Sequence, residues 1–220
     1  MTAQSHETTP REVRPIAWLC GVWRGEGSIG YGPIPNGRVS QQLTFAVADG
    51  PYLAYTAKTW LLAADPADGF SEGVAGPADA RTAPATWATP AEPAVGATPT
   101  SATVDGIGHR SPDVSKPKPW HEESGYWRVL PSASRKPPLE LEVLIADAAG
   151  FLSLYVGEVS GQRASLGTDA MMRTASAPPV GAATRLYGLI QGDLLWTWDI
   201  AGFELELGSY MAVSLSRVEG

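Results

Sequence analysis

The stretch from Gly21 to Gly27 constrains the fold most strongly, because glycine and one tryptophan alternate along it. Its sequence, GVWRGEG, places Gly21, Trp23, Gly25 and Gly27 at every second position. Alternate residues of a β-strand point to the same side, so these four would share one face of one strand. Glycine inside a strand marks a bend or a close approach by another backbone. The pattern therefore predicts the first strand of a small closed barrel filled by side chains, with a generic glycine-rich turn as the alternative.

The rest of the chain reads as short strands separated by turns. Residues 139–146 alternate most clearly, with Leu139, Leu141, Val143 and Ile145 on one face. Pro15 to Cys20 suits one helical turn at the floor of a barrel. The other expected strands cover residues 39–46, 52–62, 125–130, 151–159, 163–174, 183–190, 194–200 and 207–218. About ten strands and almost no helix predict an all-β fold, an antiparallel up-and-down barrel, with a β-sandwich as the alternative.

Two segments fall outside this pattern. Residues 1–13 are polar, and we expect them to be loose. Residues 65–119 are rich in proline and alanine, without periodicity, and such a composition buries too little surface to offset the entropy of ordering. We therefore expect a single barrel domain over residues 14–220, interrupted by a disordered, low-complexity insertion at 65–119.

Composition excludes several classes of function. The net charge of −7 and the pI near 5.0 argue against a nucleic-acid surface, which would be basic. Cys20 is the single cysteine, so no internal disulfide can form, and nothing indicates an oxidising compartment. The chain shows no signal-peptide pattern and no run of about 18 apolar residues. We expect a cytoplasmic protein without a membrane partner.

The glycine–tryptophan stretch, followed by Tyr31 and Pro33, resembles the opening of the nitrobindin family. Similar stretches are HEESGYWRV from His121, QGDLL from Gln191, and the segment from Met211 to Val218. The resemblance implies a β-barrel related in shape to fatty-acid-binding proteins and lipocalins. Typical members bind haem b and are credited with isomerising peroxynitrite to nitrate. In lipocalin-like barrels a first-strand tryptophan often packs against a last-strand cation, so we expect Trp23 beneath the guanidinium of Arg217.

Motifs of catalysis or metal binding are absent from the sequence, so we predict no catalytic residue and no metal ligand. His6 and His109 lie in segments expected to be unsupported, whereas a metal site needs rigid support. His121 belongs to the family-like stretch, where it is either a polar group at the barrel mouth or a structural hydrogen-bonding residue. Glu123 and Arg128 would join it in one polar cluster.

Tyr210 decides the functional prediction. Family members carry the axial histidine of the haem iron near the C-terminus, and matching Leu215 and Arg217 to the family's ending puts Tyr210 at that position. No histidine follows residue 121. Alternation would place Tyr210 on one face with Ala212 and Ser214, and Met211 on the other.

We therefore predict a nitrobindin-like barrel that has lost its haem ligand, needs no cofactor, is not an enzyme, and binds an unidentified small hydrophobic partner. Two alternatives stay open. One is a haem b protein that isomerises peroxynitrite through a substitute ligand, such as a tyrosine phenolate. The other is a carrier of fatty-acid-like molecules.

Overall fold

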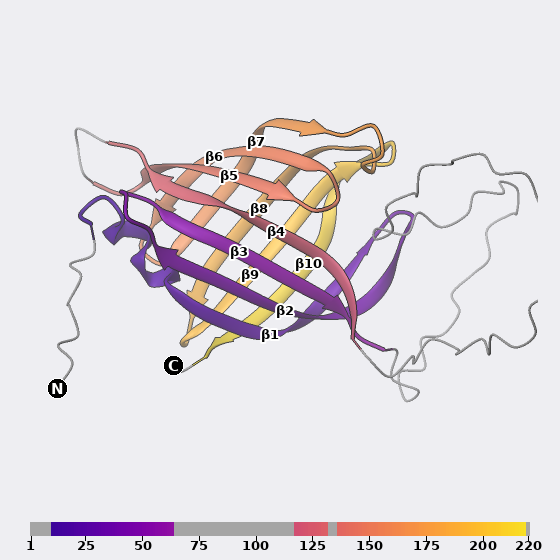
Figure 1. The fold of residues 1–220 in the computed structure, drawn as a ribbon, viewed down its shortest axis with the longest axis horizontal. Helices are drawn as coiled ribbons and strands as arrows, with labels where there is room; N and C mark the ends of the chain where they lie inside the picture. Colours follow the sequence, from indigo (N-terminus) through magenta and orange to yellow (C-terminus); the bar gives the residue numbers. More distant parts are fainter. Residues whose placement is uncertain (1–9, 64–116, 132–135, 219–220) are drawn as a thin grey trace, which may run out of the picture.

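The barrel shown in Figure 1 is a computed structural model, which describes residues 10–63, 117–131 and 136–218. A 3₁₀ helix, η1 (Arg14–Leu19), precedes ten strands. The strands are β1 (Gly21–Tyr31), β2 (Ile34–Val47), β3 (Leu53–Leu61), β4 (Lys118–Val129), β5 (Leu139–Asp147), β6 (Phe151–Ser160), β7 (Arg163–Arg173), β8 (Val180–Ile190), β9 (Asp193–Gly202) and β10 (Leu205–Arg217). Each strand pairs antiparallel with its sequence neighbours, and β1 also pairs with β10. The predicted up-and-down barrel is confirmed, and the sandwich is excluded.

Alternation of apolar and polar residues forms these strands. In β5, Leu141, Val143 and Ile145 are buried, while Glu140 and Leu144 face outward. Aromatic rings fill much of the interior, as in Trp127, Tyr187 and Trp196, which are almost completely buried. The side chains of the strands can fill the interior of a barrel of this size. The hydrophobic core therefore lies inside the barrel, and no second layer of helices or strands is needed to form it.

The glycines of β1 permit a close approach of β10. A Cβ atom at Gly25 would overlap the backbone oxygen of Ser214, and one at Gly27 would overlap that of Ala212. Trp23 has no exposed surface and faces the interior. The predicted role of this stretch, a tightly curled first strand beside another backbone, is confirmed.

The two ends of the barrel differ. At the end that we call the floor, η1 buries Ile16 and Leu19, and the indole Nε1 of Trp23 donates a hydrogen bond to the Leu19 oxygen over 2.7 Å. At the opposite end, the mouth, β3 and β5 end while β4 and β10 begin. Figure 1 shows η1 and the β1–β2 hairpin at opposite ends.

The structure corrects two predicted boundaries. Val13 is completely buried and its amide donates to the Pro10 oxygen, so the chain is already held at residues 10–13. Strand β4 begins at Lys118, inside the range predicted for the insertion, and residues 65–116 of that range lie outside the described residues. Among the described residues, no helix has the length and apolar character needed to cross a membrane.

Candidate functional site

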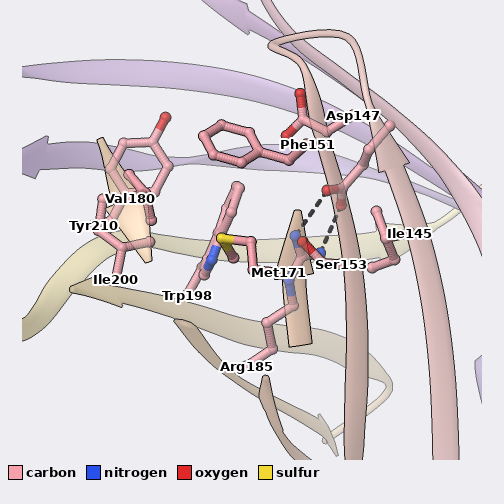
Figure 2. Close-up of a pocket in the computed structure, with 11 residues that line it drawn as sticks. Ile145, Asp147, Phe151, Ser153, Met171, Val180, Arg185, Trp198, Ile200 and Tyr210 are labelled. Carbon is pink, nitrogen blue, oxygen red and sulfur yellow. Dashed lines mark hydrogen bonds and ion pairs between the residues drawn. The ribbon is translucent and has the colours of Figure 1, made fainter. Parts of the chain in front are cut away.

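A small interior cavity lies at the mouth end of the barrel (Figure 2). Its lining comes from seven strands and includes Glu123, Asp147, Arg185, Trp198 and Tyr210. The cavity measures about 20 Å³, which is room for about one water molecule. Pockets for small-molecule ligands usually measure roughly 300–1,000 Å³. Side chains therefore already occupy the interior at this level.

A buried ion pair between Glu123 of β4 and Arg185 of β8 crosses the interior. Arg185 Nη1 lies 2.6 Å from Glu123 Oε1, and Nη2 lies 2.7 Å from Oε2, as the dashed lines in Figure 2 mark. The hydroxyl of Tyr55 also donates to Glu123 Oε1, over 2.5 Å. The guanidinium lies 4.2 Å from the centre of a Trp198 ring. The two charges are thus paired and hydrogen-bonded to each other, and aromatic side chains contact both of them.

The pKa values of the pair follow from this geometry. Burial alone would raise the pKa of Glu123, but the charge and hydrogen bonds of Arg185 outweigh it and hold that pKa well below its usual range. Burial alone would lower the pKa of Arg185, but the charge of Glu123 raises it well above its usual value. Each partner keeps the other ionised. At neutral pH the pair is therefore a carboxylate beside a guanidinium.

His121 extends the polar group toward the mouth. Its Nε2 lies 3.2 Å from Glu123 Oε2 and 3.4 Å from Asp147 Oδ2. Burial would lower the pKa of His121, but Asp147 and Glu123 together raise it above its usual value. The three residues present donor atoms within 4.8 Å of one another, a spacing that a metal ion could use. Arg185 already occupies both oxygens of Glu123, so a cation would have to compete with a guanidinium.

The structure brings together only part of the predicted polar cluster. His121 and Glu123 lie side by side in the interior, but Arg128 lies on the outer face of β4, where it pairs with Glu142. The reason is alternation: positions 121 and 123 point inward, and position 128 has the opposite parity. The prediction that Arg128 joins them at the mouth is therefore corrected.

Sequence reasoning missed the partners of this cluster, Arg185, Asp147 and Tyr55. A signal was present for Arg185, which falls between the inward-facing Ala183 and Tyr187 of β8. A buried cation requires a carboxylate, and Glu123 is the inward-facing glutamate of β4. The same parity rule that excludes Arg128 would have selected this pair.

Tyr210 lies in the interior, but not as alternation predicted. The pairing of β10 with β9 shifts between Ser209 and Met211, which is a β-bulge, and both Tyr210 and Met211 are buried. Ala212 and Ser214 face outward, so they leave no space beneath the tyrosine ring. The indole Nε1 of Trp120 donates a hydrogen bond to the Tyr210 oxygen over 2.8 Å. Burial raises the pKa of Tyr210, which keeps the phenol protonated at neutral pH.

A larger cavity, of about 600 Å³, lies at the mouth, outside the side chains that fill the interior. Its lining includes Ile29, Asn36, Leu61, Trp120, Ser209 and Tyr210. This volume is in the usual range for a small-molecule site. We call it the mouth cavity.

Neither cavity fits a haem whose iron is held by imidazole. The interior cavity is too small for a porphyrin, and the described part of the chain places no histidine on the wall of the mouth cavity. Tyr210 lines both cavities, but its hydroxyl is hydrogen-bonded to Trp120, and its raised pKa disfavours the phenolate that iron requires. His121 does not supply this ligand either, because its Nε2 already contacts the carboxylates of Glu123 and Asp147.

Comparison with known proteins places the chain in a family. Residues 12–217 match the model of the "THAP4-like, heme-binding beta-barrel domain". The chain is 41% identical to a "Ferric nitrobindin-like protein" of Beutenbergia cavernae, over 94% of each chain. It is 31% identical to a "Peroxynitrite isomerase" of Leifsonia xyli subsp. xyli, over 96% of each chain.

A solved structure shares the fold. The protein Rv2717c from M. tuberculosis superposes with a TM-score of 0.61 at 20% identity, covering 96% of this chain and 99% of that one. Three findings agree on the family of this chain. The family model matches nearly the whole chain, the fold is a closed ten-stranded barrel, and the sequence is similar to these relatives. The chain belongs to the THAP4-like, heme-binding β-barrel family, which includes ferric nitrobindin-like proteins and peroxynitrite isomerases.

Proposed function

We propose that this chain keeps the barrel of its family but has lost iron ligation, and that it functions as a haem-free binding protein for a small apolar molecule. The observation that carries the proposal is the place of Tyr210. A neutral, buried phenol, hydrogen-bonded to Trp120, stands at the position that resemblance assigns to the haem ligand. No histidine lies between residue 122 and the C-terminus to replace it.

The competing proposal is a haem enzyme that acts on peroxynitrite through the phenolate of Tyr210. It requires a nearby cation that lowers the pKa of Tyr210, but burial raises that pKa.

Haem titration of three proteins tests the proposal: wild type, Tyr210→His and Tyr210→Phe. We expect wild type and Tyr210→Phe to bind haem equally weakly, without a sharp Soret band. Tyr210→His supplies an imidazole, and we expect it to form a five-coordinate complex once the smaller ring leaves room. A tight 1:1 complex in wild type, whose charge-transfer bands vanish in Tyr210→Phe, would establish phenolate ligation and overturn the proposal.

The mouth cavity supports the second half of the proposal, a small apolar ligand. It has the volume of a ligand site, and Ile29, Leu61 and Trp120 contribute apolar surface to its wall. A fluorescent naphthalene sulfonate probe, displaced by a medium-chain fatty acid, tests it. Leu61→Trp should fill the cavity and abolish probe binding, whereas Leu152→Trp, on the exposed outer wall, should leave it unchanged. Equal probe binding by both variants would show that the mouth cavity is not the site.

A further inference from the structure

Oxidisable rings form a continuous chain through the barrel. It begins at Trp120 beside the mouth cavity and ends at Tyr55 in the interior. From the mouth inward the rings are Trp120, Tyr210, Trp198, Trp196, Tyr187, Trp127 and Tyr55. A hydrogen bond joins the first two, and the centres of successive rings after them lie 5.0 to 6.4 Å apart. Neighbouring rings are therefore in or near van der Waals contact along the whole path.

Packing alone does not account for the choice of these rings. The indole N–H groups of Trp127 and Trp198 are buried and have no hydrogen-bond partner within the described part of the chain. Leaving a buried donor unsatisfied destabilises the folded state, a cost that phenylalanine would not carry. Such groups in a folded protein call for an explanation, and a redox role is one.

Contact between the rings has a chemical consequence. Electron transfer between two groups slows exponentially with their separation, so rings in contact exchange electrons readily. Tryptophan and tyrosine are the aromatic side chains that lose an electron most easily, and phenylalanine does not lose one under comparable conditions. An electron vacancy created at one ring of such a chain can move to the others.

The charges beside the chain give it a direction. The guanidinium of Arg185 lies 4.2 Å from a Trp198 ring centre and 5.6 Å from one of Trp196, and this positive charge disfavours a radical cation on either ring. Tyr55 instead donates its hydroxyl proton to the carboxylate of Glu123 over 2.5 Å. An oxidised phenol is a strong acid, so a carboxylate in hydrogen-bond contact stabilises its neutral radical by taking the proton. Tyr55 is thus the end of the path.

We propose that the barrel conducts oxidising equivalents from one-electron oxidants at the mouth to Tyr55. The oxidant, a small inorganic radical, takes one electron from Trp120 and becomes its reduced anion. Electrons then move outward ring by ring until Tyr55 has lost one electron. Its phenolic proton passes to Glu123, which leaves a neutral tyrosyl radical and a carboxylic acid. This electron path requires neither haem nor a ligand in the mouth cavity, so the outcome of its test is independent of both.

Pulse radiolysis of the full chain with azide radicals tests the path. In wild type the absorbance of the indolyl radical should decay while that of a tyrosyl radical rises, at a rate independent of protein concentration. Freeze-quench electron paramagnetic resonance should then show a buried tyrosyl radical that is lost in Tyr55→Phe. A conversion that depends on protein concentration, or a tyrosyl signal that persists in Tyr55→Phe, would overturn the proposal.

Two variants interrupt the path inside the barrel. Tyr187→Phe retains the ring and its packing while removing the oxidisable phenol, and Trp198→Phe removes the link between Trp196 and Tyr210. Both should lose the concentration-independent phase. Trp18→Phe is the matched control, because its indole N–H is also buried without a partner among the residues that the structure describes, but its ring is not a link of this chain. A cooperative thermal unfolding transition serves as the check that each variant is folded. An unchanged phase in Tyr187→Phe and Trp198→Phe, or its loss in Trp18→Phe, would contradict a specific path.

Discussion

The guanidinium of Arg217 lies 4.1 Å from the ring centre of Trp23, and the two residues face each other across the seam where the last strand meets the first. Arg217 also donates hydrogen bonds to the backbone oxygens of Trp18 and Cys20, at the end of η1. One side chain therefore joins β10, β1 and η1 at the barrel floor. The predicted stacking of this pair is confirmed.

Removing the ring should destabilise the protein strongly. Trp23→Ala leaves a large cavity in a fully buried site, and we expect a loss of roughly 3–5 kcal/mol or more in the free energy of unfolding. The stacking itself is isolated by a double-mutant cycle of Trp23→Phe with Arg217→Met, in which the expected coupling is about 0.5–2 kcal/mol. Urea denaturation measures both. Trp23→Phe combined with Arg163→Met, on distant β7, should be additive, and equal coupling in the two cycles would contradict the contact.

The pair of Glu123 and Arg185 should behave as a buried ion pair, in contrast to Arg128 and Glu142 on the outer face. Glu123→Gln or Arg185→Met alone leaves one buried charge unpaired, and each should cost about 3–5 kcal/mol. The double variant should cost less than the sum of the two. Arg128→Met and Glu142→Gln should each change stability by less than about 1 kcal/mol, because solvent screens that pair. Similar losses for the two pairs, measured by denaturant unfolding, would contradict the difference.

Sequence alone predicted most of the fold and about half of the candidate site, and the reasons lie in particular residues. Strand parity places His121 and Glu123 together, and topology places Trp23 beside Arg217, since a closed barrel must pair its first strand with its last. Arg128 lies in the same family-like stretch as these two residues, but its parity turns it to the outer face of β4.

Other features depend on three-dimensional detail that no local pattern carries. The bulge at Ser209 and Met211 turns Tyr210 inward, and nothing in the local sequence marks it. The bidentate pairing of Arg185 with Glu123 depends on the stagger between strands that are far apart in the sequence. Parity selects the two side chains but does not determine that they meet.

The stability of the protein should depend on the protonation of His121. Its pKa is raised in the folded protein, so the folded state keeps the proton to a higher pH than the unfolded chain does. The contribution is fully present below about pH 6.5, the unfolded value, and is lost as pH rises through the folded pKa. The free energy of unfolding should therefore fall over this window, by at most about 1.4 kcal/mol per pH unit.

Denaturant unfolding across this pH range measures the effect. His121→Gln retains a polar side chain that does not titrate, and it should remove the decline. Asp147→Asn should reduce the decline, because Asp147 is the principal charge that raises the pKa. If His121→Gln declined as steeply as wild type, the titrating group would lie elsewhere.

The close approach of β1 and β10 should make Gly25 intolerant of any side chain. In Gly25→Ala the new methyl group would overlap the Ser214 backbone oxygen, and backbone atoms of two paired strands cannot move apart without breaking the seam that closes the barrel. We expect the free energy of unfolding to fall by more than about 4 kcal/mol, which is the range of exceptional point mutations, or no soluble protein to form.

Gly167→Ala is the matched control. It lies in β7, where a Cβ atom would meet nothing within 4 Å, and it should stay within about 1 kcal/mol of wild type, on the stabilising side, because alanine restricts the unfolded chain. Thermal unfolding of the two variants decides the matter. Equal stability would mean that the seam between β1 and β10 can open to accept a methyl group, and that the alternating glycines do not serve barrel closure.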